Sequence, residues 1–112
     1  MEGEGFEEGE DVSVVTCDLE GIVQTFSQGA SKLFGWEPEE VVGKQTVAIF
    51  HKPEAVQELV PRLLKQASEE GLFEEEVTFM RKDGAEFRAR LTVRPIIRDG
   101  KMVGYMGRTV KV

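Results

Sequence analysis

The feature that most constrains the fold is a pair of alternating stretches, Phe73–Arg81 and Phe87–Val93, on either side of the short segment Lys82-Asp83-Gly84. In each stretch an apolar side chain alternates with a polar one. This two-residue period is typical of a strand that buries one face and exposes the other. The aspartate and glycine between the stretches favour a tight connection. The sequence therefore predicts an antiparallel hairpin with one apolar face.

The pairing register of this hairpin can also be predicted. A two-residue turn would set Phe79 opposite Arg88, whereas a three-residue loop with its glycine in the left-handed region sets Phe79 opposite Phe87. Because a slip of one residue moves every side chain to the other face, only the second register keeps the apolar sets together. We therefore predict the bulged register. It makes Glu76 and Arg90 cross-strand neighbours on the outer face.

The other elements follow from periodicity and turn residues. We predict strands over Val12–Cys17, Ile22–Phe26 and Val103–Val112, short helices over Ala30–Phe34, Glu39–Val42 and Val47–Phe50, and a longer helix from Pro53 that stops at Gly71. Pro61 lies inside the longer helix, where we expect a kink or a break. Strands on either side of a helical block indicate an α+β domain, an antiparallel sheet with helices on one face.

Several short motifs, in this order and spacing, resemble those of a PAS domain. They are Asp18-Leu19-Glu20-Gly21 before Ile22, the run ASKLFGW from Ala30 to Trp36, Glu39-Glu40-Val41-Val42-Gly43, Arg81-Lys82-Asp83-Gly84, and Pro95-Ile96-Ile97-Arg98-Asp99-Gly100 leading to Val103-Gly104-Tyr105. The resemblance covers residues 12–112. It implies a five-stranded antiparallel sheet of strand order 2-1-5-4-3, with helices that cover one face and enclose a pocket.

The resemblance also implies a role in signalling. Domains of this family are sensory modules that bind a small ligand or haem, or ligand-free modules that dimerise and relay a conformational change. We expect the first of these roles and keep the second as the alternative. An effector domain, such as a kinase, a cyclase or a regulator, is expected outside this chain. A homodimer is expected through the outer face of the sheet or the N-terminal segment.

The charge distribution separates residues 1–11 from the rest. The formal net charge is −7, and six of the 21 acidic residues lie in this first stretch, which has no basic residue. We expect a flexible acidic tail there and a sensory domain over residues 12–112. That domain has 15 acidic and 14 basic residues, which argues against a nucleic-acid surface. Without a bilayer-length apolar run or a basic leader, the cytoplasm is the expected compartment.

The inventory of reactive side chains argues against an enzyme. Cys17 and His51 are the only cysteine and the only histidine, and the sequence has no phosphate-binding or dinucleotide-binding motif. Flavin-binding light sensors of the resembled family form a photoadduct through a cysteine near the mid-chain helices. Cys17 lies on the first predicted strand instead, where a small buried side chain is the usual role. A flavin photoadduct is therefore not expected.

A ligand pocket is predicted between the sheet and the helices. Its expected lining is Ile49, His51, Val56, Val60, Phe79, Leu91, Tyr105 and Thr109. Tyr105 and Thr109 face inward as polar groups if the Arg98-Asp99-Gly100 loop copies the first hairpin. His51 is the one residue that could hold a haem iron, provided that its ring points inward; pointing outward, it would be an ordinary surface histidine. Glu75 shares the inward parity, and we expect it at the strand end in water, with Arg108 as a second option for a partner.

Overall fold

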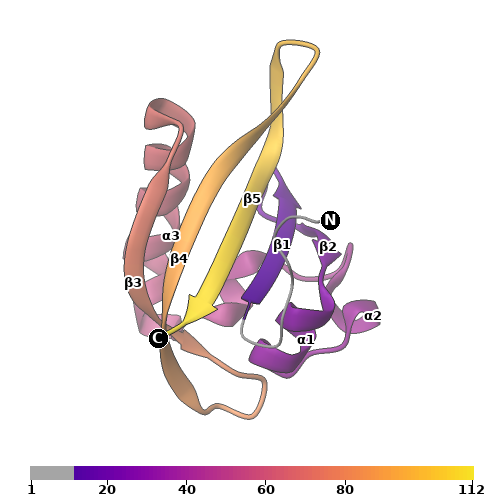
Figure 1. Ribbon diagram of the computed structural model, residues 1–112, viewed down its shortest axis with the longest axis vertical. Helices are drawn as coiled ribbons and strands as arrows, with labels where there is room; N and C mark the ends of the chain where they lie inside the picture. Colours follow the sequence, from indigo (N-terminus) through magenta and orange to yellow (C-terminus); the bar gives the residue numbers. More distant parts are fainter. Residues whose placement is uncertain (1–11) are drawn as a thin grey trace.

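The computed structural model describes residues 12–112, so the predicted acidic tail lies outside the described part of the chain. The elements in chain order are β1 (Val12–Asp18), β2 (Val23–Phe26), α1 (Gln28–Phe34), α2 (Pro38–Val41), the 3-10 turn η1 (Val47–Phe50), α3 (Pro53–Glu70), β3 (Phe73–Met80), β4 (Glu86–Arg98) and β5 (Lys101–Lys111). The strands form one antiparallel sheet in the order β2-β1-β5-β4-β3 (Figure 1). This order and the α+β class confirm the prediction.

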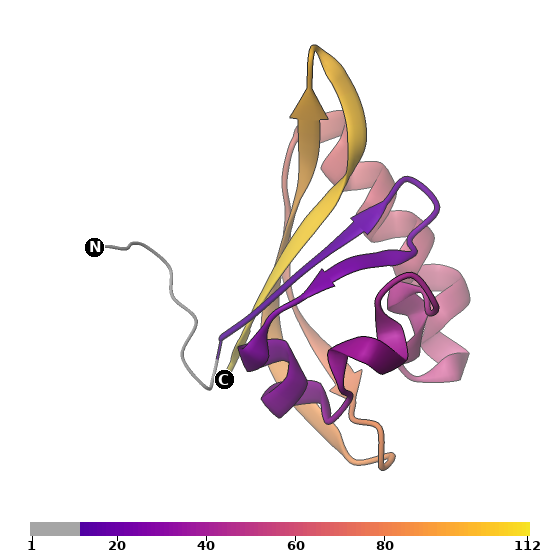
Figure 2. The same cartoon turned by 90° about the vertical axis from the view of Figure 1, so that its right-hand side faces the viewer.

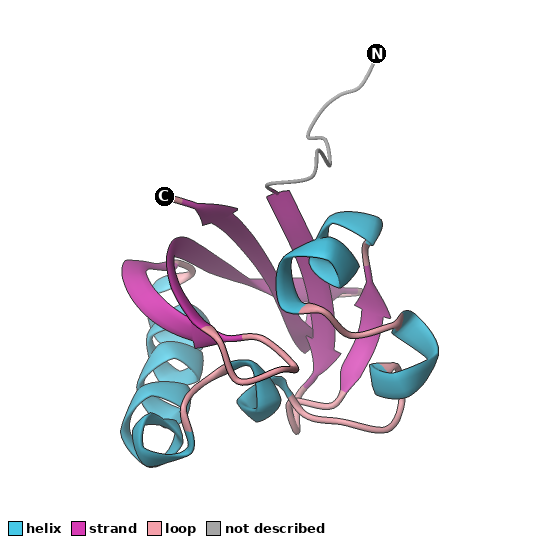
Figure 3. Ribbon diagram, turned by 90° about the horizontal axis from the view of Figure 1, so that it is seen from below, coloured by secondary structure: helices cyan, strands magenta, loops and turns pink. Residues whose placement is uncertain are grey.

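The helices lie on one side of the sheet, as the side view in Figure 2 shows. Seen from below, α3 runs along the half of the sheet formed by β3 and β4, while α1 and α2 lie by β1 and β2 (Figure 3). The apolar core lies between these two layers. No helix in residues 12–112 is long and apolar enough to span a membrane.

The hairpin of β3 and β4 has the predicted bulged register. Phe79 lies opposite Phe87, and the glycine of the loop, Gly84, has a φ of 93°. Glu76 and Arg90 are direct cross-strand neighbours, as predicted. The ion pairs run diagonally instead, because the longer arginine side chains reach the neighbouring carboxylates.

These diagonal contacts join Arg88 to Glu76 at 3.1 Å and Arg90 to Glu74 at 3.5 Å. All four side chains are exposed, so each pair contributes roughly 0.2–1 kcal/mol at most. The apolar inner face, rather than these pairs, determines the register.

The hairpin of β4 and β5 is longer than predicted, and its loop does not copy the first one. Asp99 and Gly100 form a two-residue turn with φ values of 51° and 77°, and Arg98 pairs with Lys101. Two positive φ values in succession are what the tightest hairpin turns require. A register shift after Ile96 then inserts one residue. This bulge restores the parity that the shorter loop would have reversed, so the rest of β5 keeps the predicted inward and outward faces.

Helix α3 runs without a break through Pro61. Proline removes the hydrogen bond to the carbonyl of Gln57, four residues earlier. Both residues are exposed, so water can replace that bond. The opposite face buries Leu59, Leu63 and Ala67 against the sheet. Of the predicted kink or break, the break is therefore wrong, because the buried stripe holds the helix together across the proline.

A cluster of aromatic rings joins the helices to the sheet near the loop between β3 and β4. The ring of Phe34 lies 4.6 Å from that of Phe50 and 5.2 Å from that of Phe79, measured between centroids. Phe26 stacks on Phe50 at 5.7 Å. The cluster fixes α1 and η1 against β3, which positions the residue that follows η1, His51.

Two glycines on β5 give a matched test of the packing. A Cβ atom at Gly104 would overlap the carbonyl oxygen of Cys17, whereas one at Gly107 would make ordinary contacts, the nearest 3.7 Å from Leu91 Cδ1. We expect Gly104→Ala to lower the free energy of unfolding by about 1–3 kcal/mol and Gly107→Ala to change it by less than about 1 kcal/mol. Urea unfolding of both variants measures this difference. Equal midpoints would contradict the close approach of β1 and β5.

Candidate functional site

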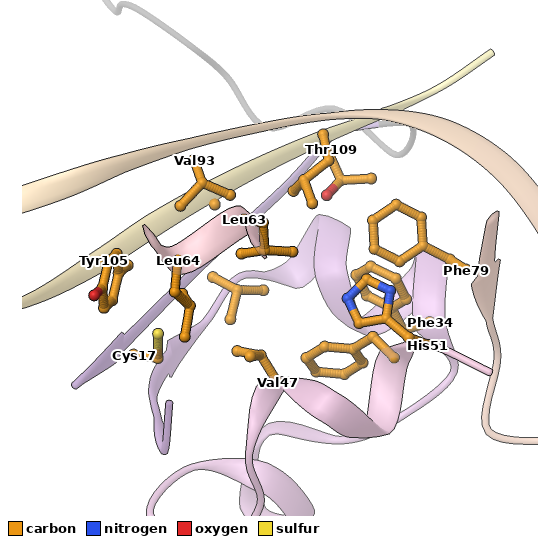
Figure 4. A pocket seen from close by; sticks show the side chains of 14 residues that line it. Cys17, Phe34, Val47, His51, Leu63, Leu64, Phe79, Val93, Tyr105 and Thr109 are labelled. Atoms are coloured by element: carbon orange, nitrogen blue, oxygen red, sulfur yellow. The ribbon is translucent and has the colours of Figure 1, made fainter. Parts of the chain in front are cut away.

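An internal cavity of about 50 Å³ lies between the sheet and the helices (Figure 4). It is lined by Val15, Cys17, Phe34, Val47, Phe50, His51, Leu63, Leu64, Phe79, Leu91, Val93, Tyr105, Gly107 and Thr109. All the helices and strands except β2 and α2 contribute residues to this lining, and so does η1. No Asp, Glu, Lys or Arg belongs to this lining, so the cavity is almost wholly apolar.

His51 is the most polar group of the lining, and its ring points inward. Its backbone N–H donates to the carbonyl of Ala48 at 3.2 Å, and a bridge links it to Phe79 of β3. The imidazole stacks on the Phe79 ring at 5.1 Å and is only 4% exposed. Its Nδ1 atom has no hydrogen-bond partner within residues 12–112. Of the two orientations that the sequence left open, the structure has the buried one.

Burial also determines the charge of His51. Removal from water lowers the pKa of the imidazole from 6.5 to about 4. The ring is therefore neutral at physiological pH, with one nitrogen as a donor and the other as an acceptor. A neutral ring with an unsatisfied buried nitrogen is rare, since most such atoms find a partner.

Tyr105 and Thr109 both border the cavity from β5, and both are buried. The Tyr105 ring forms part of the wall. Burial raises the pKa of its hydroxyl, and a hydrogen bond with the Ser68 side chain of α3 opposes that shift. Thr109, at 3% exposed, is a second polar side chain of β5 at the cavity wall.

Cys17 is a further lining residue, which the sequence reasoning treated only as a small buried side chain. Burial raises the pKa of the thiol to about 11, and the neighbouring charge of Asp18 adds to this. The thiol is therefore protonated at physiological pH, and a thiolate nucleophile is not available there.

Three of the expected lining residues lie elsewhere. Ile49 and Val56 border a separate open groove beside Trp36 and Met80, and His51 borders both this groove and the cavity. Val60 lines neither hollow.

From α3, Leu63 and Leu64 line the cavity instead of the residues nearer its start. The helical period identified the apolar stripe, but the stripe alone does not tell which of its turns faces the hollow. The alternation of β1 could have added Val15 and Cys17, because they share the inward parity once β1 pairs with β5.

Glu75 forms no part of the cavity wall. Its carboxylate receives two hydrogen bonds from Arg62 of α3, at 2.6 Å and 3.2 Å. This arginine holds the pKa of the Glu75 carboxyl below its usual value. The partner is therefore Arg62 and not Arg108, and the pair joins α3 to β3 at a partly exposed edge.

The space available decides between candidate ligands. Pockets for drug-sized molecules measure about 300–1,000 Å³. At about 50 Å³, this cavity holds roughly three to five water-sized groups. This volume is smaller than haem or flavin, although the His51 ring points inward. Residues 12–112 also contain no group of three His, Cys, Asp or Glu that could hold a metal ion.

A family model described as a PAS domain matches residues 11–108. The chain belongs to the PAS domain family. Solved PAS domains have the same fold: one from Colwellia psychrerythraea superposes with a TM-score of 0.85 at 24% identity, covering 90% of this chain and 86% of that one. The PAS domain of a LuxR-family transcriptional regulator from Burkholderia thailandensis, described in complex with ethanol, gives a TM-score of 0.74 at 11% identity, covering 90% and 88%.

Two further proteins are similar to this chain. A light-oxygen-voltage domain studied with a flavin analogue gives a TM-score of 0.73 at 26% identity, covering 89% of this chain and 76% of that one. The two-component system protein A of Emericella nidulans is 29% identical over 96 residues, which are 86% of this chain and 14% of that protein. The chain thus spans about one seventh of the length of this curated relative.

The buried imidazole predicts a specific dependence of stability on pH. The unfolded chain takes up a proton on His51 near pH 6.5, whereas the folded chain does so only near pH 4. Unfolding is therefore favoured progressively as the pH falls from about 6.5 to about 4, by roughly 3 kcal/mol in total. The His51→Phe variant keeps an aromatic ring on Phe79 and should lose this dependence. Urea unfolding of both proteins across this pH range measures the difference between their free energies of unfolding. The carboxylates are the same in both proteins, so their contribution cancels in that difference. Parallel profiles would contradict the burial of a neutral ring.

Proposed function

We propose that this PAS domain is a sensory module that binds a small molecule in its internal cavity and relays that event without catalysing a reaction. The observation that carries the proposal is the cavity itself, an apolar hollow bordered by the buried ring of His51. The structure describes 101 residues of this domain. A filled core would make the folded state more stable, because a void removes dispersion contacts from the side chains around it. A hollow kept at the centre of the core is what a ligand site requires.

A non-catalytic role is supported by the chemistry of the lining. The thiol of Cys17 is held protonated and the imidazole of His51 is held neutral, each by burial. Neither group has a carboxylate or an amine on the cavity wall, and the titratable neighbour of Cys17 there, Tyr105, has its own pKa raised by burial. A general base or a nucleophile needs such a partner to be activated.

The likeness to a two-component system protein supports a place within a larger signalling protein. We propose that an effector domain of that kind receives the signal outside this sequence. The Burkholderia thailandensis PAS domain, described with ethanol, supports a ligand of small size. We propose the cytoplasm as the compartment of the protein.

Xenon tests whether the cavity admits a small molecule, because it enters apolar cavities without needing a hydrogen bond. We expect xenon pressure to shift the backbone amide resonances of Leu91, Val93 and Tyr105, which surround the cavity. Gly107→Ala places a methyl group beside Leu91 and Val93 and should weaken the effect. Absence of any saturable shift in the parent protein would overturn ligand binding.

An absorption spectrum tests the size argument separately. We expect no Soret band after incubation with haem and no flavin band in the blue, because both groups exceed the space beside His51. A Soret band in the parent that is lost in His51→Ala would show instead that the helical wall opens for haem.

A second candidate function is a ligand-free module that dimerises. The outer face of the sheet favours it, since Val14, Thr16 and Met106 lie there half-buried without helices over them. We propose a homodimer through this face, the commonest symmetric arrangement. Met106→Arg should shift light scattering at high concentration from dimer to monomer. Glu69→Arg, an exposed charge change on α3, should not. A parent protein that stays monomeric would count against this candidate.

A further inference from the structure

We propose that residues 1–11, the acidic segment that precedes β1, bind back across the outer face of the sheet and cover it between β1 and β4. This face lies on the opposite side of the sheet from the cavity, so the proposal does not depend on a ligand. The occupant is a segment of the same chain, in place of a second copy.

The outer face has a mixed pattern over β1, β5 and β4. Register pairs align its side chains in rows that cross the three strands. The two middle rows are Thr16 with Met106 and Arg94, and Val14 with Arg108 and Thr92. The apolar and hydroxyl side chains of these rows are half-buried, whereas both arginines are exposed. A partner that covers this area must therefore bring both an apolar group and negative charge.

The positive charge of Arg94 and Arg108 is not neutralised within residues 12–112. Neither guanidinium takes part in an ion pair there, and the glutamates of β3 on this face already bind Arg88 and Arg90. Arg94 and Arg108 lie diagonally across the pair of β4 and β5, which sets them roughly 7–8 Å apart. Two like charges at this distance repel each other, and a carboxylate between them relieves the repulsion.

Residues 1–11 have the composition that this face lacks. They contain six of the 21 acidic residues and no basic residue, whereas residues 12–112 are nearly balanced, with 15 acidic and 14 basic residues. Phe6 is the one aromatic residue of the segment, and Glu7 and Glu8 follow it directly. An aromatic ring beside two carboxylates matches a methionine beside two arginines.

The segment is also attached at the right place and is long enough. Val12 pairs with Val110, two residues along β5 from Arg108. Arg94 lies four residues along and two strands across from Val12, roughly 17 Å away by standard strand spacings. Eleven extended residues span up to about 36–40 Å, so half of the segment reaches both arginines. Gly9 gives the chain the conformational freedom to reverse direction before β1.

A second copy is the competing occupant of this face. A two-fold pair centred on Met106 would bring Arg94 and Arg108 of both copies together, which opposes association. The acidic segment has the opposite sign, and its attachment gives it an effective concentration in the millimolar range. Each exposed ion pair is weak, so binding depends on this attachment. A second copy or another partner must therefore displace the segment before it occupies the face.

The experiment uses the full chain with a nitroxide spin label on Gly3→Cys and measures the broadening of amide resonances. Cys17 is buried and its thiol is protonated at neutral pH, so the label attaches to the introduced cysteine. We expect strong broadening of the Thr16, Arg94 and Met106 amides at low salt and little in α3, across the sheet (Figure 2). In about 1 M salt this broadening should fall about 2-fold or more, because screening shortens the range of the charges.

Two variants identify the groups that bind the segment. Arg94→Gln combined with Arg108→Gln removes both charges and should lower the broadening at Thr16 and Met106 about 2-fold or more at low salt. Arg98→Gln is the matched control, because Arg98 is an exposed arginine of the same strand at the turn to β5, beyond this area. It should leave the broadening unchanged.

Each outcome supports or overturns the proposal. Equal broadening in the parent, in the double variant and in 1 M salt would show that charge does not hold the segment, which overturns it. A mixture of spin-labelled protein with ¹⁵N-enriched unlabelled protein identifies the sheet that is covered. No broadening in the mixture supports binding to the segment's own sheet. Broadening there means that the segment covers a second copy, and dimers by light scattering with an unbroadened outer face mean that the second copy itself covers it; both results overturn the proposal.

The xenon test of the cavity is independent of these measurements. The spin label reports on the outer face of the sheet and xenon reports on the inner one, so the two proposals can fail separately.

Discussion

The inner face of the sheet depends on one register constraint, the bulged loop between β3 and β4. With Gly84 in the left-handed region, Phe79 lies opposite Phe87 and both rings face the helices. A turn shorter by one residue would have set Phe79 opposite Arg88, so that only one of the two rings could face the helices. The aromatic cluster built on Phe34 then fixes α1 and η1, and η1 delivers His51 to the Phe79 ring. The position of the candidate site is in this way a consequence of a three-residue loop.

The same constraint explains why a polar ring is tolerated in the core. The backbone of His51 is bridged to Phe79 and its side chain is stacked on that residue, so both are held in place independently of any hydrogen bond to the imidazole. The ring can therefore remain buried and neutral with an unsatisfied nitrogen.

Much of the fold can be predicted from the sequence, because the alternation of side chains and the turn residues indicate the same elements. Alternation fixed the faces of β3 and β4, and turn residues fixed the ends of most elements. The second hairpin was predicted with the wrong loop, yet the inward parity of Tyr105 holds, since the bulge after Ile96 compensates for the tighter turn. No local sequence pattern indicates that bulge, because it arises from the way in which the two strands pair.

The site was less predictable, for a tertiary reason. Which residues of an apolar stripe enclose a hollow depends on how α3 rests on the sheet. Leu63 and Leu64 border the cavity, while Val56 borders the outer groove, although a spacing of seven and eight residues puts all three on one side of the helix. The volume of the cavity is likewise a small difference between large packed volumes. The cavity volume cannot be derived from the spacing of residues in the sequence. It is this volume that favours a small molecule over haem.

Strand β5 offers the shortest route from the cavity to a partner. Tyr105 and Thr109 border the cavity on one face, and between them Met106 lies on the outer face of the same strand. β5 is also central in the sheet, paired with β1 on one side and β4 on the other, so a shift in it is shared by both neighbours. A ligand that displaces the inner side chains therefore acts on the outer surface through the thickness of one strand. Because the interior is close-packed, the strand responds as a unit. A partner bound to the outer face could sense an occupied cavity without contacting it.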